Sequence, residues 1–341
     1  MQSFMYQRAS SPEAAVAAAA AVDTGVDVPP VQAPGQFIAG GTTILDLMKL
    51  DVMRPATLVD INPIGRARQG QIEVTDGGLR FGALVRMAQA ADHPAVRRDY
   101  PVIADTLKLA ASQQLRNMAT LGGNVLQRTR CHYFRDTSWP CNKRTPGSGC
   151  AALDGQNRKH AVLGTSEHCI ATYPGDFAQA LTALDARVEV VGPRGLRSIP
   201  FAELHRLPGN TPHVETTLAP GELITMITVP AGPWTRRSLY LKVRDRESYE
   251  FALASAAVAL DLADGTVRHA RIALGGVATV PWRAREAEQA LEGQPLDEER
   301  AMAAADAAFA NANPHAHNAY KVPLGKRTLV RALLAAARME I

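Results

Sequence analysis

The sequence has no long apolar run and no long basic run. A membrane span needs about 20 consecutive apolar residues, and the nearest approach, residues 14–22, is shorter and poor in Leu and Ile. The Ser11-Pro12-Glu13 stretch before it is typical of a helix start, so we expect neither a membrane span nor a cleaved signal peptide there. Because the basic residues form no run interleaved with aromatic ones, nucleic acid is not an expected partner.

Cysteine is missing from most of the chain, since all four cysteines fall in one stretch: Cys131, Cys141, Cys150 and Cys169. A chain this long does not need disulfides for stability, so the clustering suggests a metal site. The C-x9-C-x8-C-x18-C spacing lacks the C-x2-C pairs of zinc ribbons and bacterial ferredoxins. Spacing alone therefore leaves an iron–sulfur cluster, zinc and unliganded thiols open.

The stretch that holds the cysteines is basic. Between residues 128 and 168, seven Arg and Lys residues stand against three acidic ones. A positive surround favours thiolates and offsets an anionic cluster. A basic loop can also dock a partner or lie in solvent, so the charge does not by itself decide between these roles.

The 341 residues are too many for one ordinary core, so two or three domains are expected. Periodicity predicts strands at residues 57–62, 71–76, 78–84, 187–192 and 223–230, and helices at 44–50, 85–91, 101–112 and 176–184. Residues 128–168 show neither the helical nor the strand period, which indicates a long, loop-like insertion. A domain boundary is expected near residues 231–234. After it, two strands flank an Asp264-Gly265 hairpin turn, and helices are expected at 282–291, 297–310 and 324–339. This order indicates an α+β module.

Two glycine pairs occur in similar surroundings, as AGGTT at residues 39–43 and TLGGN at residues 120–124. A glycine pair can simply form a tight turn. It can also let backbone N–H groups approach a phosphate beside hydroxyl donors. Two such segments favour one extended ligand with a pyrophosphate, and because Gly-x-Gly-x-x-Gly is absent, the site is not of the Rossmann type.

These two motifs, with YPGDFAQAL at residues 173–181 and LKVRDRESYEFALASAAVAL from residue 241, resemble the FAD-binding subunit of the molybdenum hydroxylases. The resemblance covers nearly the whole chain and implies an α+β fold. Its first part is a two-part FAD-binding domain of the vanillyl-alcohol-oxidase/PCMH type at residues 1–232, with subdomains 1–60 and 61–232 and an insertion at 128–169. Its second part is a small C-terminal domain of the CO dehydrogenase flavoprotein type at residues 233–341.

The resemblance also implies roles for single residues. The FAD pyrophosphate would be wrapped by Ile38, Ala39, Gly40, Gly41, Thr42, Thr43 and Ile44. Residues along the cofactor would be Ala110, Ser112, Thr120, Gly122, Gly123 and Asn124, while Asp176 would hydrogen-bond it and Ile224 and Lys242 would approach the isoalloxazine ring. Without the resemblance, Asp176 is equally a helix N-terminal carboxylate and Lys242 a solvated strand residue.

The insertion has a resemblance of its own. The segment CHYFRDTSWPCNKRTPGSGC, with GTSEHC further on, resembles the insertion of bacterial periplasmic aldehyde oxidoreductase flavoproteins, where four cysteines hold a [4Fe-4S] cluster. This implies that Cys131, Cys141, Cys150 and Cys169 are the ligands, with His168 the residue most easily mistaken for one. A polar loop without periodicity would gain from a metal cross-link, so a structural or interface role of the cluster is expected.

In this family an aldehyde is oxidised at a molybdenum cofactor on a large subunit. Electrons cross two [2Fe-2S] clusters on a small subunit to FAD, which discharges them to an external acceptor such as a ferredoxin-like protein, a quinone or oxygen. The present sequence has no Ser-His-Asp, HExxH or P-loop motif, so we expect it not to bind the carbonyl substrate itself.

Two alternatives stay open at this stage. One is a non-redox interaction subunit with a four-cysteine zinc loop, and the other is a self-sufficient flavin oxidase. The resemblance also implies a periplasmic location by co-export with a signal-bearing partner, with the cytoplasm as the alternative.

Overall fold

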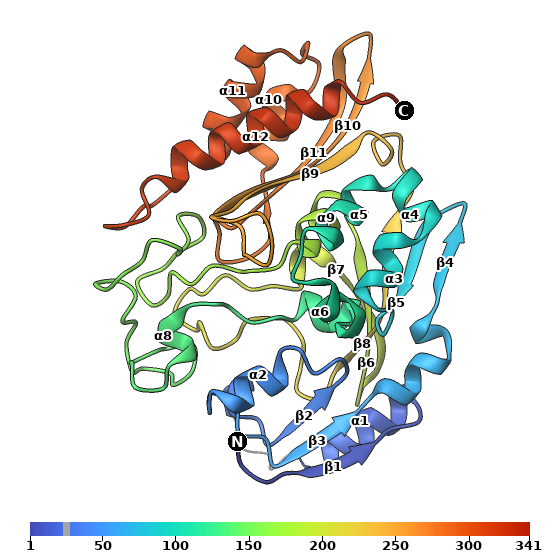
Figure 1. The fold of residues 1–341 in the computed structure, drawn as a ribbon, viewed down its shortest axis with the longest axis vertical. Coiled ribbons are helices and arrows are strands. Elements are labelled where there is room, and N and C mark those ends of the chain that lie inside the picture. Colours follow the sequence, from blue (N-terminus) through green and yellow to red (C-terminus); the bar gives the residue numbers. More distant parts are fainter. Residues whose placement is uncertain (23–27) are drawn as a thin grey trace.

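Three β-sheets follow one another through the molecule (Figure 1). The computed structural model describes residues 1–22 and 28–341. The first sheet is three-stranded in the order β1-β3-β2, the second five-stranded in the order β4-β5-β8-β6-β7, and the third four-stranded in the order β12-β11-β10-β9. This mixture of helices with mainly antiparallel sheets is the expected α+β class.

The first sheet is small and parallel. Its strands are β1 (Met5–Arg8), β2 (Gly35–Ile38) and β3 (Thr57–Asp60), and both outer strands pair with the buried central strand β3. Helix α1 (Pro12–Ala21) begins as predicted, because the Ser11 side chain accepts a hydrogen bond from the Ala14 amide at 3.1 Å. Helix α2 (Ile44–Lys49) follows the first glycine pair directly.

The second sheet carries the main core. Its strands are β4 (Ile72–Thr75), β5 (Gly78–Gly82), β6 (Arg187–Gly192), β7 (Gly195–Pro200) and β8 (Leu223–Pro230). The helices of this part are α3 (Met87–Asp92), α4 (Pro94–Asp99), α5 (Pro101–Lys108), α6 (Gln113–Met118), α7 (Leu121–Val125) and α9 (Phe177–Ala183). Alternate residues of β6 point into the core that these helices share with the sheet.

The third sheet is covered on both faces. Its strands are β9 (Ser238–Val243), β10 (Ala254–Ala263), β11 (Thr266–Gly275) and β12 (Trp282–Arg283), and its helices are α10 (Arg285–Leu291), α11 (Glu298–Ala308) and α12 (Lys321–Ala337). Along β10, Ala257 and Ala259 join the main core while Val258 and Leu260 face α10 to α12. Small side chains let helices approach this strand from both sides, with α5 and α9 opposite α12 (Figure 1).

The structure also corrects several expectations. The second glycine pair lies inside helix α7 rather than in a loop, and Trp282 belongs to strand β12 instead of starting a helix. The first strand, β1, was not anticipated, because its four exposed residues show no apolar alternation. The insertion contains one short helix, α8 (His132–Arg135), and is otherwise irregular as predicted. Among the described helices, none is both long and apolar enough to cross a membrane.

Candidate cofactor-binding site

A cavity of about 640 Å³ lies between the two glycine segments. The first segment contributes Ala39, Gly40, Gly41, Thr42, Thr43 and Ile44 to its wall, the second contributes Thr120, Gly122 and Gly123, and strand β8 adds Ile224. Segments 80 residues apart in the chain therefore face one space, which is what an extended ligand requires. The size is within the range of ordinary cofactor pockets, about 300–1,000 Å³.

The first segment presents backbone donors to this cavity. The amides of Gly40, Gly41, Thr42 and Thr43 donate no hydrogen bond to any described residue. Neither threonine hydroxyl has a partner in the part of the chain that the structure describes. Gly41 has a φ of +75°, a conformation that favours glycine. Unpaired amides beside hydroxyls suit the oxygens of a phosphate.

Gly40 touches the backbone just before the second segment. A Cβ atom on Gly40 would lie 2.1 Å from the Met118 carbonyl oxygen and 3.1 Å from the Ala119 Cα. Only glycine leaves room for this approach. The first glycine pair is thus required by close contact between two backbones as well as by the cavity.

The second segment is organised by Thr120. Its hydroxyl caps helix α7 and accepts a hydrogen bond from the Gly123 amide at 3.2 Å. Gly122 is buried against Ala83, where a Cβ would be only 2.9 Å from the alanine Cβ. Gly123 is exposed on the cavity side, so the two glycines have different functions: one allows packing and the other leaves access.

Two residues that the sequence did not single out connect the segments. Asn62 donates from Nδ2 to the Ala39 carbonyl at 2.8 Å and accepts from the Arg86 guanidinium at 2.9 Å. Arg86 also donates to the Met118 carbonyl, and Asp60 fixes Asn62 by accepting from its Nδ2 at 2.7 Å. We call Asn62 and Arg86 the clasp. No local pattern marks it, because it depends on contacts between segments far apart in sequence.

The remaining predicted residues lie outside the cavity wall. Ile38 packs in the small core under α2, Ala110 is buried, and Ser112 caps α6 by accepting from the Leu115 amide at 3.4 Å. Asn124 has a buried Oδ1 without a hydrogen-bond partner among the described residues. Such an atom is costly unless something donates to it, and because Asn124 directly follows Gly123 of the cavity wall, it is the nearest of these residues to a bound molecule in sequence.

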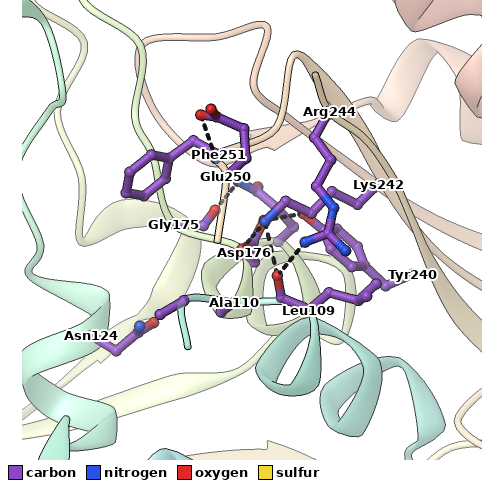
Figure 2. Close-up of polar contacts among 12 residues, drawn as sticks. Leu109, Ala110, Asn124, Gly175, Asp176, Tyr240, Lys242, Arg244, Glu250 and Phe251 are labelled. Carbon is purple, nitrogen blue, oxygen red and sulfur yellow. Dashed lines mark hydrogen bonds and ion pairs between the residues drawn. The ribbon is translucent and has the colours of Figure 1, made fainter. Parts of the chain in front are cut away.

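Asp176 and Lys242 form a buried pair, shown in Figure 2, with Nζ 2.7 Å from the Asp176 Oδ2. Tyr240 donates to the other carboxylate oxygen at 2.5 Å, while Lys242 and Arg244 both donate to the Leu109 carbonyl, at 3.1 and 3.2 Å. Burial raises the pKa of Asp176, and the Lys242 charge opposes that rise. The pair therefore holds the Leu109–Ala110 backbone against strand β9, and Lys242 is not a solvated strand residue.

The four cysteines share one neighbourhood and none is in a disulfide. Cys141 and Cys150 face each other across an isolated antiparallel bridge. Burial raises the pKa of Cys131 to about 12, and Cys141 and Cys169 add to the rise. Burial also raises the pKa of Cys169 to about 11, with Cys150 and Cys141 adding and Lys143 opposing. Cys131 packs in one small core with Cys141 and in another with Cys150, so these thiols occupy one region.

A backbone amide points at one of these sulfur atoms, because Ala171 donates to the Cys169 Sγ at 3.5 Å. Amide donors of this kind stabilise thiolates and the sulfurs of iron–sulfur clusters. Four thiols with such a donor suit a cluster. In the described residues, no three or more His, Cys, Asp or Glu side chains converge on the position of a single metal ion.

The histidine beside the cysteines is His160 and not His168. His160 Nε2 lies 3.2 Å from the Cys131 Sγ, whereas His168 is exposed. His168, which was expected to be easily mistaken for a ligand, is the sequence neighbour of Cys169 but is not the histidine in contact with a thiol. A chain reversal between residues 131 and 160 brings a different imidazole to the thiol.

Most of the basic residues of the insertion are engaged in ion pairs. Arg130 and Arg135 bind Asp46 of α2, at 3.2 and 2.8 Å, and Arg158 binds Asp245 at 3.0 Å. These pairs attach the insertion to the first and third parts of the molecule. The positive charge is thus used largely for docking within the chain, with Lys143 the residue whose charge acts on Cys169.

The cavity lies between two glycine segments, and the chain lacks the Rossmann fingerprint. These features are typical of a protein that binds a dinucleotide in a site of another type, and a thiol-rich insertion adjoins the cavity. Residues 2–232 match the FAD binding domain in molybdopterin dehydrogenase, and residues 239–336 match the CO dehydrogenase flavoprotein C-terminal domain. The chain is 50% identical to the aldehyde oxidoreductase FAD-binding subunit PaoB of Escherichia coli (strain K12), over 100% of both chains. It is 27% identical to the carbon monoxide dehydrogenase medium chain of Hydrogenophaga pseudoflava, over 88% of both.

Solved structures agree with these relatives. Carbon monoxide dehydrogenase from Hydrogenophaga pseudoflava superposes with a TM-score of 0.74 and 27% identity, covering 98% of this chain and 97% of that one. The chain therefore belongs to the FAD-binding subunits of the molybdenum hydroxylase family, and it is an oxidoreductase subunit. The expected family and fold are confirmed.

Proposed function

We propose that the protein is the FAD-binding, [4Fe-4S]-containing electron-transfer subunit of a heterotrimeric molybdenum-dependent aldehyde oxidoreductase. The observation that carries this proposal is a thiol cluster in direct continuity with the cavity. Ala171, whose amide donates to the Cys169 Sγ, and Thr172 after it both line the cavity. The full-length similarity to an aldehyde oxidoreductase FAD-binding subunit supports the choice of enzyme.

The glycine segments would hold the FAD pyrophosphate. The unpaired amides of Gly40, Gly41, Thr42 and Thr43 would donate to phosphate oxygens. Thr120 would keep the Gly123 side of the cavity open by capping α7, and the unpartnered Asn124 Oδ1 would accept a hydrogen bond from the cofactor. When bound, FAD supplies electron transfer, while the protein supplies binding and orientation.

Asp176 and Lys242 would position the loop that lies beside the flavin. Their charged groups are satisfied by one another and by Tyr240 and Leu109. A direct hydrogen bond from Asp176 to FAD would have to replace one of these. Their most direct contribution is to hold Leu109 and Ala110 in place.

The four cysteines would hold the cluster. A zinc ion binds thiolate sulfur at about 2.3 Å, which draws its ligands into one tight group, whereas a four-iron cluster separates them. Seven basic residues between positions 128 and 168, and the Ala171 amide that donates to the Cys169 Sγ at 3.5 Å, would offset the negative charge of a [4Fe-4S] cluster.

Electrons would arrive from a small partner subunit with two [2Fe-2S] clusters, after oxidation of the aldehyde at a molybdenum cofactor on a large partner. They would leave to a ferredoxin-like protein, a quinone or oxygen. Medium chains are the counterparts of this chain in the carbon monoxide dehydrogenases, which supports an assembly of several subunits.

We also propose export to the periplasm with a signal-bearing partner. Cell fractionation with and without the partner's signal sequence tests this.

Cofactor analysis of the purified complex tests the main proposal. We expect one FAD and an iron–sulfur absorbance band for each copy of this chain, beyond what the small subunit contributes. Cys141→Ser is expected to remove this iron and to leave most of the FAD. Zinc in place of iron would support the non-redox subunit, aldehyde turnover by this chain alone would support a self-sufficient oxidase, and full retention of iron in Cys141→Ser would contradict the ligand assignment.

A further inference from the structure

Lys143 connects the four-cysteine site to the cavity. It follows the proposed cluster ligand Cys141 by two positions. Its Nζ pairs with the Glu215 Oε1 at 3.1 Å and donates to the Pro212 carbonyl at 3.0 Å. The side chain is only 12% exposed, and it lines the cavity. One residue thus lies two positions from a proposed cluster ligand and also lines the cofactor cavity.

The charge around Lys143 is not balanced. Glu215 also binds Arg128, whose guanidinium lies 3.0 Å from the Oε2, and this arginine is 15% exposed. Arg128, Lys143 and Glu215 all line the cavity. Two cations share one carboxylate, which leaves an excess of one positive charge. Because the group is largely shielded from solvent, that charge is screened less than a surface charge.

The excess charge lies near a second cysteine. The residue before Lys143, Asn142, donates from Nδ2 to the carbonyl of His168 at 3.1 Å, and His168 directly precedes Cys169. The chain then runs from Cys169 through Ala171 and Thr172 along the cavity wall. The positive group therefore lies where it can act on both the thiol cluster and the cavity.

We propose that the excess positive charge of Lys143 and Arg128 over Glu215 sets the reduction potential of the iron–sulfur cluster next to the flavin cavity. The proposal rests on the [4Fe-4S] assignment above. A reduced cluster carries one more negative charge than the oxidised cluster, so a fixed cation stabilises the reduced form. Lys143 is then a potential-setting residue, and the cluster belongs to the redox system as well as to the structure.

A redox titration of the purified complex, followed by the electron paramagnetic resonance of the reduced cluster, tests this. In Lys143→Met, we expect the ratio of reduced to oxidised cluster at a fixed potential to fall about tenfold, equal to about 59 mV for one electron. Glu215→Gln leaves both cations unopposed, so its shift is expected in the opposite direction. Lys143→Arg keeps the charge and is expected to restore the potential of the unmodified protein.

Lys159→Met is the matched control. It removes a charge from the same insertion, but Lys159 is 55% exposed and pairs with Asp245 at 3.5 Å, so we expect no shift. The proposal is overturned if Lys143→Met shifts the potential no more than Lys159→Met, or if Glu215→Gln shifts it in the same direction as Lys143→Met. If Lys143→Met does not assemble the cluster, Glu215→Gln alone tests the proposal. A shift of the cluster to a higher reduction potential supports it, and a shift to a lower potential overturns it. An unmodified complex that lacks this cluster signal refutes the cofactor assignment instead.

Discussion

The clasp of Asn62 and Arg86 is expected to control FAD affinity. Arg86 donates to the Met118 carbonyl behind the second glycine segment and to the Asn62 Oδ1, and Asn62 donates to the Ala39 carbonyl of the first. Arg86→Met keeps a long side chain but removes both donors. The spacing of the two segments should then be less well defined, although the two sheets keep their cores.

The structure sets the size of the effect. A hydrogen bond to a charged group contributes about 1.5–3 kcal/mol, but Arg86 is partly exposed and water replaces part of each bond. For the two bonds together we expect a loss of about 1.5–3 kcal/mol. Since about 1.4 kcal/mol corresponds to a tenfold change in Kd, FAD affinity should fall by roughly 10- to 150-fold if the loss falls on the bound state.

Fluorescence titration of FAD into cofactor-depleted protein measures this effect. Arg80→Met is the matched control, because Arg80 is also partly exposed and donates to Glu189 at 3.0 Å, but does not line the cavity. Asn62→Leu and the double variant with Arg86→Met complete a thermodynamic cycle for the free energy of FAD binding. We expect the coupling energy between these two residues to be well above zero. The reasoning is refuted if Arg86→Met lowers the thermal stability of the FAD-free protein while leaving the Kd within twofold of that of Arg80→Met.

Three further substitutions test other parts of the structure. Gly40→Ala places a Cβ 2.1 Å from the Met118 carbonyl oxygen and should abolish stable FAD binding in the same titration, whereas Gly77→Ala, which meets no atom closer than 3.7 Å, should bind normally. Thr120→Ala removes the cap of α7 and should cost about 1 kcal/mol in chemical denaturation, with Thr120→Ser largely restoring it. Burial lowers the pKa of Lys321 to about 7 in the folded protein, whereas the unfolded chain keeps this proton to about pH 10. Between these two pH values, the free energy of unfolding should therefore rise by about 1.4 kcal/mol per pH unit because of this residue. Lys321→Met should remove that gain between about pH 7.5 and 9, and an unchanged slope would contradict the assignment.

The local features of the site could be predicted from the sequence. Ser11 caps its helix, Asp264 and Gly265 have φ values of +50° and +78° in the hairpin turn, and both glycine segments line one cavity. Each of these depends on a few neighbouring residues with distinctive backbone preferences. The convergence of the glycine segments was inferred from their similarity to one another, and the contact of Gly40 with Met118 gives it a physical basis.

The clasp and the environment of the thiols could not be predicted in this way. Asn62 and Arg86 are ordinary polar residues until the fold brings residues 39 and 118 together. His160 reaches Cys131 across 29 positions, while periodicity says nothing about an irregular insertion. Helix α7 was missed because five residues with two glycines carry no helical period, and only the Thr120 cap marks its start.

The insertion is irregular, yet it is attached to the rest of the chain at several points. Arg135 binds Asp46 of α2, Lys143 binds Glu215, and the Lys321 Nζ donates to the Lys159 carbonyl at 3.0 Å from the C-terminal helix. Surface ion pairs contribute at most about 1 kcal/mol each, but the buried contacts of Lys143 and Lys321 are harder to replace by water. These contacts tie the cysteine-bearing stretch to the rest of the polypeptide, so a cross-link is not the only use that a cluster would have here. The unbalanced positive charge of Arg128 and Lys143 over Glu215, which lines the cavity, supports the proposal that Lys143 sets the potential of the cluster.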